Sequence, residues 1–369
     1  KRKGLGAYPS AENAFRIETE RLAFHLMHRI QEATVISPSA LVGFIALSHE
    51  RPALSKARLR RLIGFIIKLG QQRGARFSDS IKASLKRAEA DIAKSDEAYW
   101  GEPHPITSAE MGAEVGAEVS AEVSARREGS SETHETSQGK EGLLHPFEAR
   151  GEALKDLTTE ALSLLRRLID PVEKLKQTMY TVSDSHRIEL DYYRNCILGL
   201  MAPEVIVCAV VASHWRGLRD DRLQVEARWL SDLFKLEFIY RNDAPFEEII
   251  GEIVKTLTAV GLIERKGSLW RICEEMEEEA LTLSSSLRHL MECYWVAAHT
   301  LKATAKSPME AKAWVKMASE QAELAFLQGE IRRKEAASTV TLANALQWFV
   351  RQGWVEETSV TEGRKRTKH

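Results

Sequence analysis

Residues 37–48 read Ser-Pro-Ser-Ala-Leu-Val-Gly-Phe-Ile-Ala-Leu-Ser, and this stretch decides the fold of the first part of the chain. Ser37 is a favoured N-cap residue, and Pro38 suits the first helical position because its missing N–H costs no hydrogen bond there. From Ala40 to Leu47 the chain carries no polar side chain. A helix that is apolar all round is buried, so the sequence predicts a central core helix.

The next helix is predicted to begin at Ser55, a second favoured N-cap residue. Apolar residues then recur three and four positions apart, which predicts one buried stripe. The stripe consists of Leu59, Leu62, Ile63, Ile66 and Ile67.

A later stretch, residues 203–223, is similar to residues 38–59. Each begins with proline and an apolar helix, and the two align with a one-residue gap. The matched residues are Ser48-His49-x-Arg51, Leu54 and Arg58-Leu59 in the first, and Ser213-His214-x-Arg216, Leu218 and Arg222-Leu223 in the second. Two similar helix–turn–helix units explain this likeness, and so does chance, because short matches arise often.

The remaining pattern predicts further helices and short strands. Ser183 is expected to cap the helix after a strand near 176–182, and Pro203 to separate two short buried helices. Two strands around Gly267 within residues 262–272 predict a hairpin, and helices followed by a hairpin resemble a winged-helix arrangement. Helices are expected at 148–168, 219–235, 245–260, 274–304, 307–333 and 342–352.

Residues 109–124 repeat a four-residue unit, AEMG-AEVG-AEVS-AEVS. A period of four drifts around a helix of 3.6 residues per turn, so these apolar residues cannot keep one face. With the polar segment that follows, this predicts a disordered acidic linker over residues 93–145. The predicted fold is mainly α, with a basic helical domain at 1–92 and a helical domain with the winged-helix-like hairpin at 146–369.

Composition is that of a soluble, folded chain, with 44% hydrophobic and 28% charged residues. The net charge of -1 hides an asymmetry: residues 1–92 carry 17 Lys/Arg and 8 Asp/Glu, whereas residues 93–145 carry 4 and 11. Four scattered cysteines without CxxC spacing predict a reducing compartment. A start at Lys1, with no signal-like segment, predicts a piece of a longer protein.

No stretch is expected to span a membrane. The best candidate, residues 196–213, contains Pro203 and Glu204 at its centre, where a spanning helix is normally uninterrupted and uncharged.

The octapeptide Asp191-Tyr192-Tyr193-Arg194-Asn195-Cys196-Ile197-Leu198 places two aromatics, a cation and an amide before an apolar run. It resembles the Tyr-Arg-Asn-Asn-x-Leu segment in the C-terminal region of bacterial glycerol-3-phosphate 1-O-acyltransferases, although Cys196 stands where asparagine is usual. Residues 33–42, 261–265 (Gly-Leu-Ile-Glu-Arg) and 292–298 (Glu-Cys-Tyr-Trp-Val-Ala-Ala) resemble further segments of that region in the same order.

This resemblance implies acyl transfer from acyl-CoA or acyl carrier protein to glycerol-3-phosphate, the first step of phospholipid synthesis. The family uses a His-x4-Asp motif as general base and a downstream glycine–arginine block for phosphate, and both precede the region resembled here. The expected partner is therefore an N-terminal acyltransferase domain of the same protein. The expected location is the cytoplasmic face of the inner membrane, peripherally bound.

Two stretches imitate these catalytic blocks. His186 and Asp191 have His-x4-Asp spacing, but five residues on a helix turn the side chains about 140° apart, and chance alone supplies such a match often. Residues 362–366 (Glu-Gly-Arg-Lys-Arg) lie in a polar tail with no preceding strand. We therefore expect no catalytic, cofactor or metal residue in this chain. A self-sufficient enzyme would require the His186–Asp191 pair.

Two groups of residues remain as candidates for contacts. The first consists of the family-signature residues Asp191, Tyr192, Tyr193, Arg194, Asn195 and Leu198, which either support the fold where helices meet or face the acyltransferase domain. The second is a row of cations on the helix from Ser55. They either form a solvated face or contact an anionic membrane surface. These are Lys56, Arg58, Arg60, Arg61 and Lys68.

The predicted function is thus an accessory C-terminal portion of a glycerol-3-phosphate acyltransferase, which scaffolds the catalytic domain and aids membrane docking. The alternative is a winged-helix nucleic-acid-binding or interaction protein. Nucleic acid is not the expected partner, because residues 219–235, taken as the recognition helix, mix acidic and basic side chains.

Overall fold

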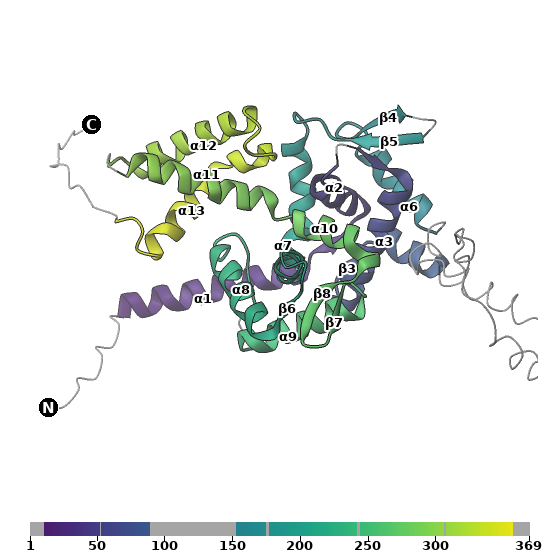
Figure 1. Cartoon of the computed structure of the whole chain (residues 1–369), viewed down its shortest axis with the longest axis horizontal. Helices are drawn as coiled ribbons and strands as arrows, with labels where there is room; N and C mark the ends of the chain where they lie inside the picture. The colour runs from purple at the N-terminus through teal and green to yellow at the C-terminus, as the bar shows by residue number, and fades with distance from the viewer. Residues whose placement is uncertain are drawn as a thin grey trace, which may run out of the picture.

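The computed structural model describes residues 11–51, 53–88, 153–174, 177–241, 244–305 and 308–356. The described part is mainly helical, as predicted, with short strands between the helices. Figure 1 shows helices α2 and α7 at the centre, the helices α11 to α13 on one side, and α1 extending away from the body. The predicted linker at 93–145 and the tail from residue 358 lie outside the described residues.

The first winged-helix-like unit is built from segments on both sides of the predicted linker. Its elements are α2 (Pro38–Ser48), β2 (Leu54–Ser55), α3 (Lys56–Arg73), α6 (Ala153–Leu164), β4 (Asp170–Lys174) and β5 (Gln177–Thr181). The strands form an antiparallel sheet in the order β2-β5-β4, with Leu54 opposite Tyr180.

The helix starts of this unit are as predicted. The Ser37 hydroxyl accepts from the backbone N–H of Ala40 at 3.2 Å, and the Ser55 hydroxyl accepts from that of Arg58 at 3.3 Å. All five residues of the predicted stripe in α3 are buried, and so are most residues of α2. A short parallel pair, β1 (Val35–Ile36) with β3 (Arg76–Phe77), ties the start of α2 to the end of α3.

The second unit repeats this arrangement. Its elements are α7 (Arg187–Ala212), β6 (Leu218–Arg219), α8 (Asp220–Leu233), α9 (Phe246–Ala259), β7 (Ile263–Lys266) and β8 (Leu269–Ile272). The strand order is β6-β8-β7, with Leu218 opposite Trp270. The hairpin predicted within residues 262–272 is therefore confirmed.

The likeness between residues 38–59 and 203–223 reflects two units of one topology. Leu54 and Leu218 occupy the same register position, each opposite an aromatic residue of the sheet's middle strand. Leu59 and Leu223 are both buried in the following helix. Of the two explanations left open by the sequence, the structure supports two similar units.

Helix α7 corrects two expectations. It is one continuous helix with Pro203 inside it, rather than two helices that meet there. An interior proline frees the carbonyl four residues earlier, and Gln31 Nε2 donates to that carbonyl, on Gly199. Ser183 is not the N-cap either: the cap residue is His186, without a side-chain capping bond, and the Ser183 hydroxyl instead contacts the His186 ring.

The C-terminal part consists of short helices around α11. The predicted helix 274–304 is broken at Ser286–Leu287 into η1 (Glu274–Met276), α10 (Glu277–Ser285) and α11 (Arg288–Thr304). Then follow α12 (Ala311–Leu327), η2 (Lys334–Ala337) and α13 (Thr339–Arg351). The predicted helix 307–333 is therefore shorter than expected at both ends.

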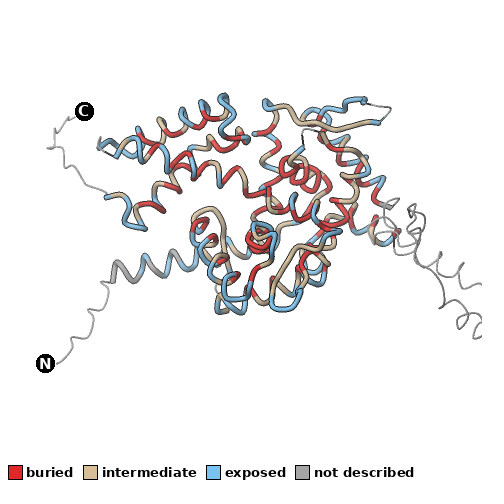
Figure 2. The backbone as a smooth tube through the Cα atoms, in the orientation of Figure 1, coloured by how far each residue is buried: buried red, intermediate tan, exposed pale blue. Residues whose placement is uncertain are grey.

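One hydrophobic core runs through both units and the C-terminal helices. In Figure 2 the buried residues gather along α2, α7 and the helices around them. The predicted domain boundaries near residues 92 and 146 lie outside the described residues and stay a prediction. The described segments on either side of them share one sheet and one hydrophobic core.

By length and composition alone, α7 is the single described helix apolar enough to cross a membrane. Of its apolar window, 67% is buried inside the fold. A core helix surrounded by α2, α8, α9 and α10 is mostly buried in this way, and the described chain therefore gives no clear transmembrane span.

Candidate functional site

The octapeptide lies in the N-terminal half of α7, where α7 crosses α2. A Cβ atom on Gly43 of α2 would come within 2.6 Å of Tyr193 Cβ, so the two helices touch there because position 43 has no side chain. Leu198 is buried in the core, whereas Tyr192 is 72% exposed. The two tyrosine rings therefore have different surroundings, although they meet edge to face with centroids 5.5 Å apart.

Arg194 is the largest fully buried side chain in the described part of the chain. Its guanidinium contacts the Asp191 carboxylate one helical turn earlier and lies 3.6 Å from Glu335 of η2. Asn195 Nδ2 also donates to Asp191, at 3.1 Å. Arg187 donates to both Glu335 oxygens, at 3.0 and 3.1 Å. The octapeptide thus ties α7 to the C-terminal helices through buried charges.

Burial and close charged partners set the direction in which the pKa of each carboxyl group in this network shifts. Burial raises the pKa of Asp191, although Arg194 and Asn195 oppose the shift. Burial also favours a raised pKa for Glu335, but Arg187 and Arg194 outweigh it and the pKa is lowered. The Glu335 carboxylate pairs with two arginines, and removal of one partner would leave a buried charge with less compensation.

His186 and Asp191 have separate partners. The His186 ring contacts the Ser183 hydroxyl at 3.2 Å, whereas Asp191 contacts Arg194 and Asn195. This agrees with the angular separation expected on a helix. The Glu362–Arg366 stretch lies outside the described residues. Among the residues that are described, no cluster of three His, Cys, Asp or Glu has the geometry to hold a metal ion.

Most of the cations on α3 are engaged within the protein. Arg58 pairs with Glu278, and Arg61 donates to Glu279 Oε2 at 2.9 Å and to the Glu275 carbonyl at 2.8 Å. The other contacts are Lys56 with the Thr159 hydroxyl at 3.3 Å and Lys68 with the Val260 carbonyl at 3.2 Å. These contacts join α3 to α10, α6 and α9, which the sequence did not predict. Membrane contact through these cations, Arg60 included, stays a prediction.

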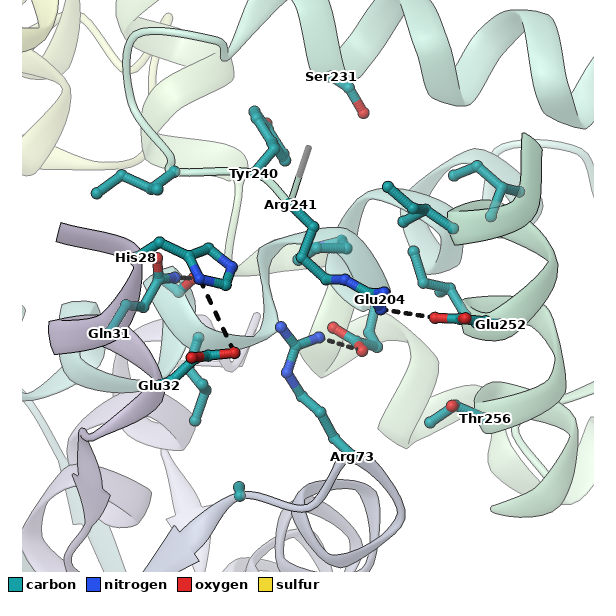
Figure 3. A pocket seen from close by; sticks show the side chains of 18 of the residues that line it. His28, Gln31, Glu32, Arg73, Glu204, Ser231, Tyr240, Arg241, Glu252 and Thr256 are labelled. Carbon is teal, nitrogen blue, oxygen red and sulfur yellow. Dashed lines mark hydrogen bonds and ion pairs between the residues drawn. The ribbon is translucent and has the colours of Figure 1, made fainter. Parts of the chain in front are cut away.

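Sequence reasoning missed a cleft of about 820 Å³ beside the C-terminal end of α1. Figure 3 shows charged side chains from several elements along its walls. Arg73 of α3 pairs with Glu204 of α7, and Arg241 donates to Glu252 of α9 at 2.6 Å. Burial raises the pKa of Glu204, against the effect of Arg73. Because each of these arginines is paired with a carboxylate, the four residues add little net charge to the cleft walls.

Helix α1 (Ala11–Glu32) carries a second feature that the sequence analysis passed over. Phe15, Leu22, Leu26 and Ile30 are spaced seven, four and four residues apart, which places them on one face. They are 76%, 69%, 59% and 54% exposed. We call these four residues the α1 stripe. Leu22, Leu26 and Ile30 follow one another along this face, and Thr19 separates them from Phe15. Exposed apolar side chains in such a row mark an interaction surface.

In a winged-helix fold, the helix directly before the hairpin is the one that contacts DNA bases. The helix before the hairpin is α9, not the helix at 219–235, and it carries Glu247, Glu248 and Glu252 against Lys255. Glu247 and Glu252 pair with Arg228 and Arg241. With two of its three carboxylates paired and one lysine, α9 presents no excess of positive charge to a phosphate backbone. The absence of nucleic acid as a partner stays a prediction.

Two winged-helix-like units share one core and are tied to the C-terminal helices by buried charges. The chain belongs to the family of glycerol-3-phosphate acyltransferase C-terminal regions, which it matches over residues 7–98 and 144–358. The match skips residues 99–143, most of the predicted linker. No curated protein matches the chain significantly. The predicted family is therefore confirmed, and the chain is an accessory part of such an acyltransferase.

Proposed function

We propose that this chain is the scaffold against which the acyltransferase domain of the same protein packs. Membership of a family of C-terminal regions means that the rest of such a protein precedes this part in sequence. Helix α1 is the first described helix, and the α1 stripe leaves its apolar face open. The exposed stripe is the observation that carries the proposal.

Helix α1 is held to the core near its C-terminal end. There, Gln31 donates to the Gly199 carbonyl of α7. Figure 1 shows the N-terminal half extending away from the other elements. A projecting helix with one apolar face suits a helix-in-groove contact, and its fixed end transmits the contact to the core helix α7.

The α1 stripe is tested by single charge insertions in the full-length acyltransferase. We expect Leu26→Asp to lower glycerol-3-phosphate acylation and to loosen the catalytic domain against limited proteolysis, because a carboxylate in an apolar contact is costly. His25→Asp is the matched control, since it adds one carboxylate at the neighbouring exposed position. Wild-type activity and protease resistance in Leu26→Asp and Leu22→Asp would contradict the proposal.

Membrane docking through the cations of α3 is a further part of the proposal, with peripheral binding to the cytoplasmic face of the inner membrane. Its support is the family's lipid-forming chemistry and the acid-free basic run of α3. The internal pairs of Arg58 and Arg61 weigh against a large contribution from those two side chains. Co-sedimentation with liposomes tests it: binding should rise with anionic lipid and fall with salt.

A further inference from the structure

A cavity of about 320 Å³ lies where three segments meet: the turn after α2, the chain from β5 to the start of α7, and the chain just before η2. Its floor is apolar and its rim is charged. The polar residues that line it are His49, Glu50, Arg51, Tyr180, Asp184, Arg187, Arg332 and Arg333.

The rim carries more positive than negative charge. The single carboxylate of Glu50 has three guanidinium groups around it, from Arg288 at 2.9 Å, Arg333 at 3.3 Å and Arg332 at 3.8 Å. Arg187 is balanced by Glu335. The remaining lining charges are Arg51, which has no ion-pair partner among the described residues, and Asp184. The Glu292 carboxylate also accepts from the backbone N–H groups of Arg332 and Arg333. With Glu292 counted, and with Arg51 and Asp184 offset against each other, one positive charge is in excess.

Two buried side chains of the rim also have unused polar atoms. His49 is 8% exposed, and the structure gives its Nε2 no hydrogen-bond partner; the same holds for Nε of Arg333, which is 7% exposed. Buried polar atoms are normally satisfied, so an unpaired one needs an explanation. A ligand in the cavity would supply the missing partners.

In the second unit, the histidine of the corresponding turn has a partner within the protein. His214, which corresponds to His49, has its Nε2 3.4 Å from the Glu226 carboxylate. By the alignment of Leu54 with Leu218, the position of Glu226 is taken by Leu62 in the first unit. The first unit therefore lacks the internal acceptor and leaves the His49 ring facing the cavity.

We propose that this cavity binds a phosphate dianion, free or as a phosphate monoester. A phosphate group carries about −1.5 to −2 charges at pH 7 and three strong acceptor oxygens, so it can bond to more of the rim donors at once than a carboxylate with its two oxygens. Arginine forks suit phosphate oxygens geometrically. The cavity volume is at the lower end of the range for small-molecule sites, about 300–1,000 Å³. This binding does not depend on the docking role of α1.

Binding there has a structural consequence. The ligand would join the turn at residues 49–51 to Arg332 and Arg333, which precede η2. It would thus hold the C-terminal helices onto the first unit and raise the stability of the whole chain by mass action.

The test is calorimetric titration and thermal unfolding of the 369-residue chain at constant ionic strength, with inorganic phosphate, glycerol-3-phosphate and acetate. We expect saturable binding of the phosphates and a rise in Tm, with acetate far weaker. Tighter binding of glycerol-3-phosphate than of inorganic phosphate would identify a soluble ester as the ligand. Binding to phosphatidylcholine vesicles that requires added phosphatidic acid would identify a lipid headgroup instead.

Arg332→Gln is the informative variant, because its side chain is 72% exposed and its removal should leave the fold intact. It should weaken phosphate binding about tenfold or more, as expected for a charge-assisted bond. Arg351→Gln, an exposed arginine at the end of α13, is the matched control and should bind like wild type. Equal affinity in the two variants, acetate binding as tight as phosphate, or no saturable phosphate binding would overturn the proposal.

Discussion

The two winged-helix-like units share a topology but differ in the length of their first helix and in the turn that follows it. In the second unit α7 extends upstream by residues 187–202, which carry the octapeptide and its buried charges. In the first unit α2 begins at Pro38. The turn after the helix differs too, since His214 has an internal acceptor and His49 has none. A repeated framework has thus acquired an anchoring role in one copy and an open polar cavity in the other.

The largest expected effect concerns the upstream extension of α7. Arg194→Ala should lower the free energy of unfolding by about 3–5 kcal/mol, because it leaves Asp191 and Glu335 buried with fewer partners. Urea denaturation of the chain measures this. Tyr192→Ala, at a position that is 72% exposed, is the control and should change little. A large loss of activity in the full-length enzyme with unchanged stability would instead assign Arg194 to substrate binding.

The next effect is the dependence of stability on pH that His49 causes. Burial, together with Arg58 and Arg51, lowers the pKa of His49 to about 4. The unfolded chain therefore binds more protons than the folded one between about pH 6.5 and pH 4, and stability falls as the pH drops through that window. The loss attributable to His49 is about 3 kcal/mol at most.

His49→Gln should remove this part of the pH dependence, whereas His214→Gln serves as the control from the other unit. Urea unfolding at several pH values, without phosphate, gives both profiles. If His49→Gln keeps the wild-type profile, the ring is not buried as a neutral group.

A smaller effect concerns the crossing of α2 with α7. Gly43→Ala should cost about 1–3 kcal/mol, because its Cβ would lie 2.6 Å from Tyr193 Cβ. At the corresponding position of the second unit, the buried Cys208 lies with its thiol 3.5 Å from the Ala280 carbonyl. Gly251→Ala in α9 is the control: its Cβ meets nothing within 4 Å, and the change should stabilise by about 0.5–1 kcal/mol. Thermal unfolding distinguishes the two substitutions.

The smallest effect concerns Pro203, the proline that the alignment pairs with Pro38. Gln31→Ala should cost about 1 kcal/mol, because the Gly199 carbonyl freed by Pro203 loses its donor. In a Pro203→Ala background that carbonyl regains its helical partner, so the same change should cost less. A double-mutant cycle with no coupling would show that Gln31 does not compensate for the proline.

Much of this architecture was readable from local sequence. The N-caps Ser37 and Ser55, the all-apolar α2 and the stripe on α3 follow rules that act within a few residues. The hairpin at 262–272 follows from its glycine turn. The octapeptide predicted the family because its residue types stand in nearly the same order as in the family's segment.

The rest depended on partners far away in the chain. Nothing near Pro203 indicates that Gln31 would satisfy the freed carbonyl and keep α7 continuous. The partner of Arg58 is 220 residues further on, so the cations of α3 looked free in the sequence. The α1 stripe was overlooked, since only the fold shows that no described element covers it.

The sequence by itself determined the starts of α2 and α3, the hairpin and the family, because capping, periodicity and residue order are local properties, whereas it left the repeated unit open. Only the tertiary structure decided which charged side chains have an oppositely charged partner and which do not. Glu335 lies 148 residues from Arg187, and Arg333 lies 283 residues from Glu50. Electrostatic pairing depends on distance in space, and the fold alone brings these groups together.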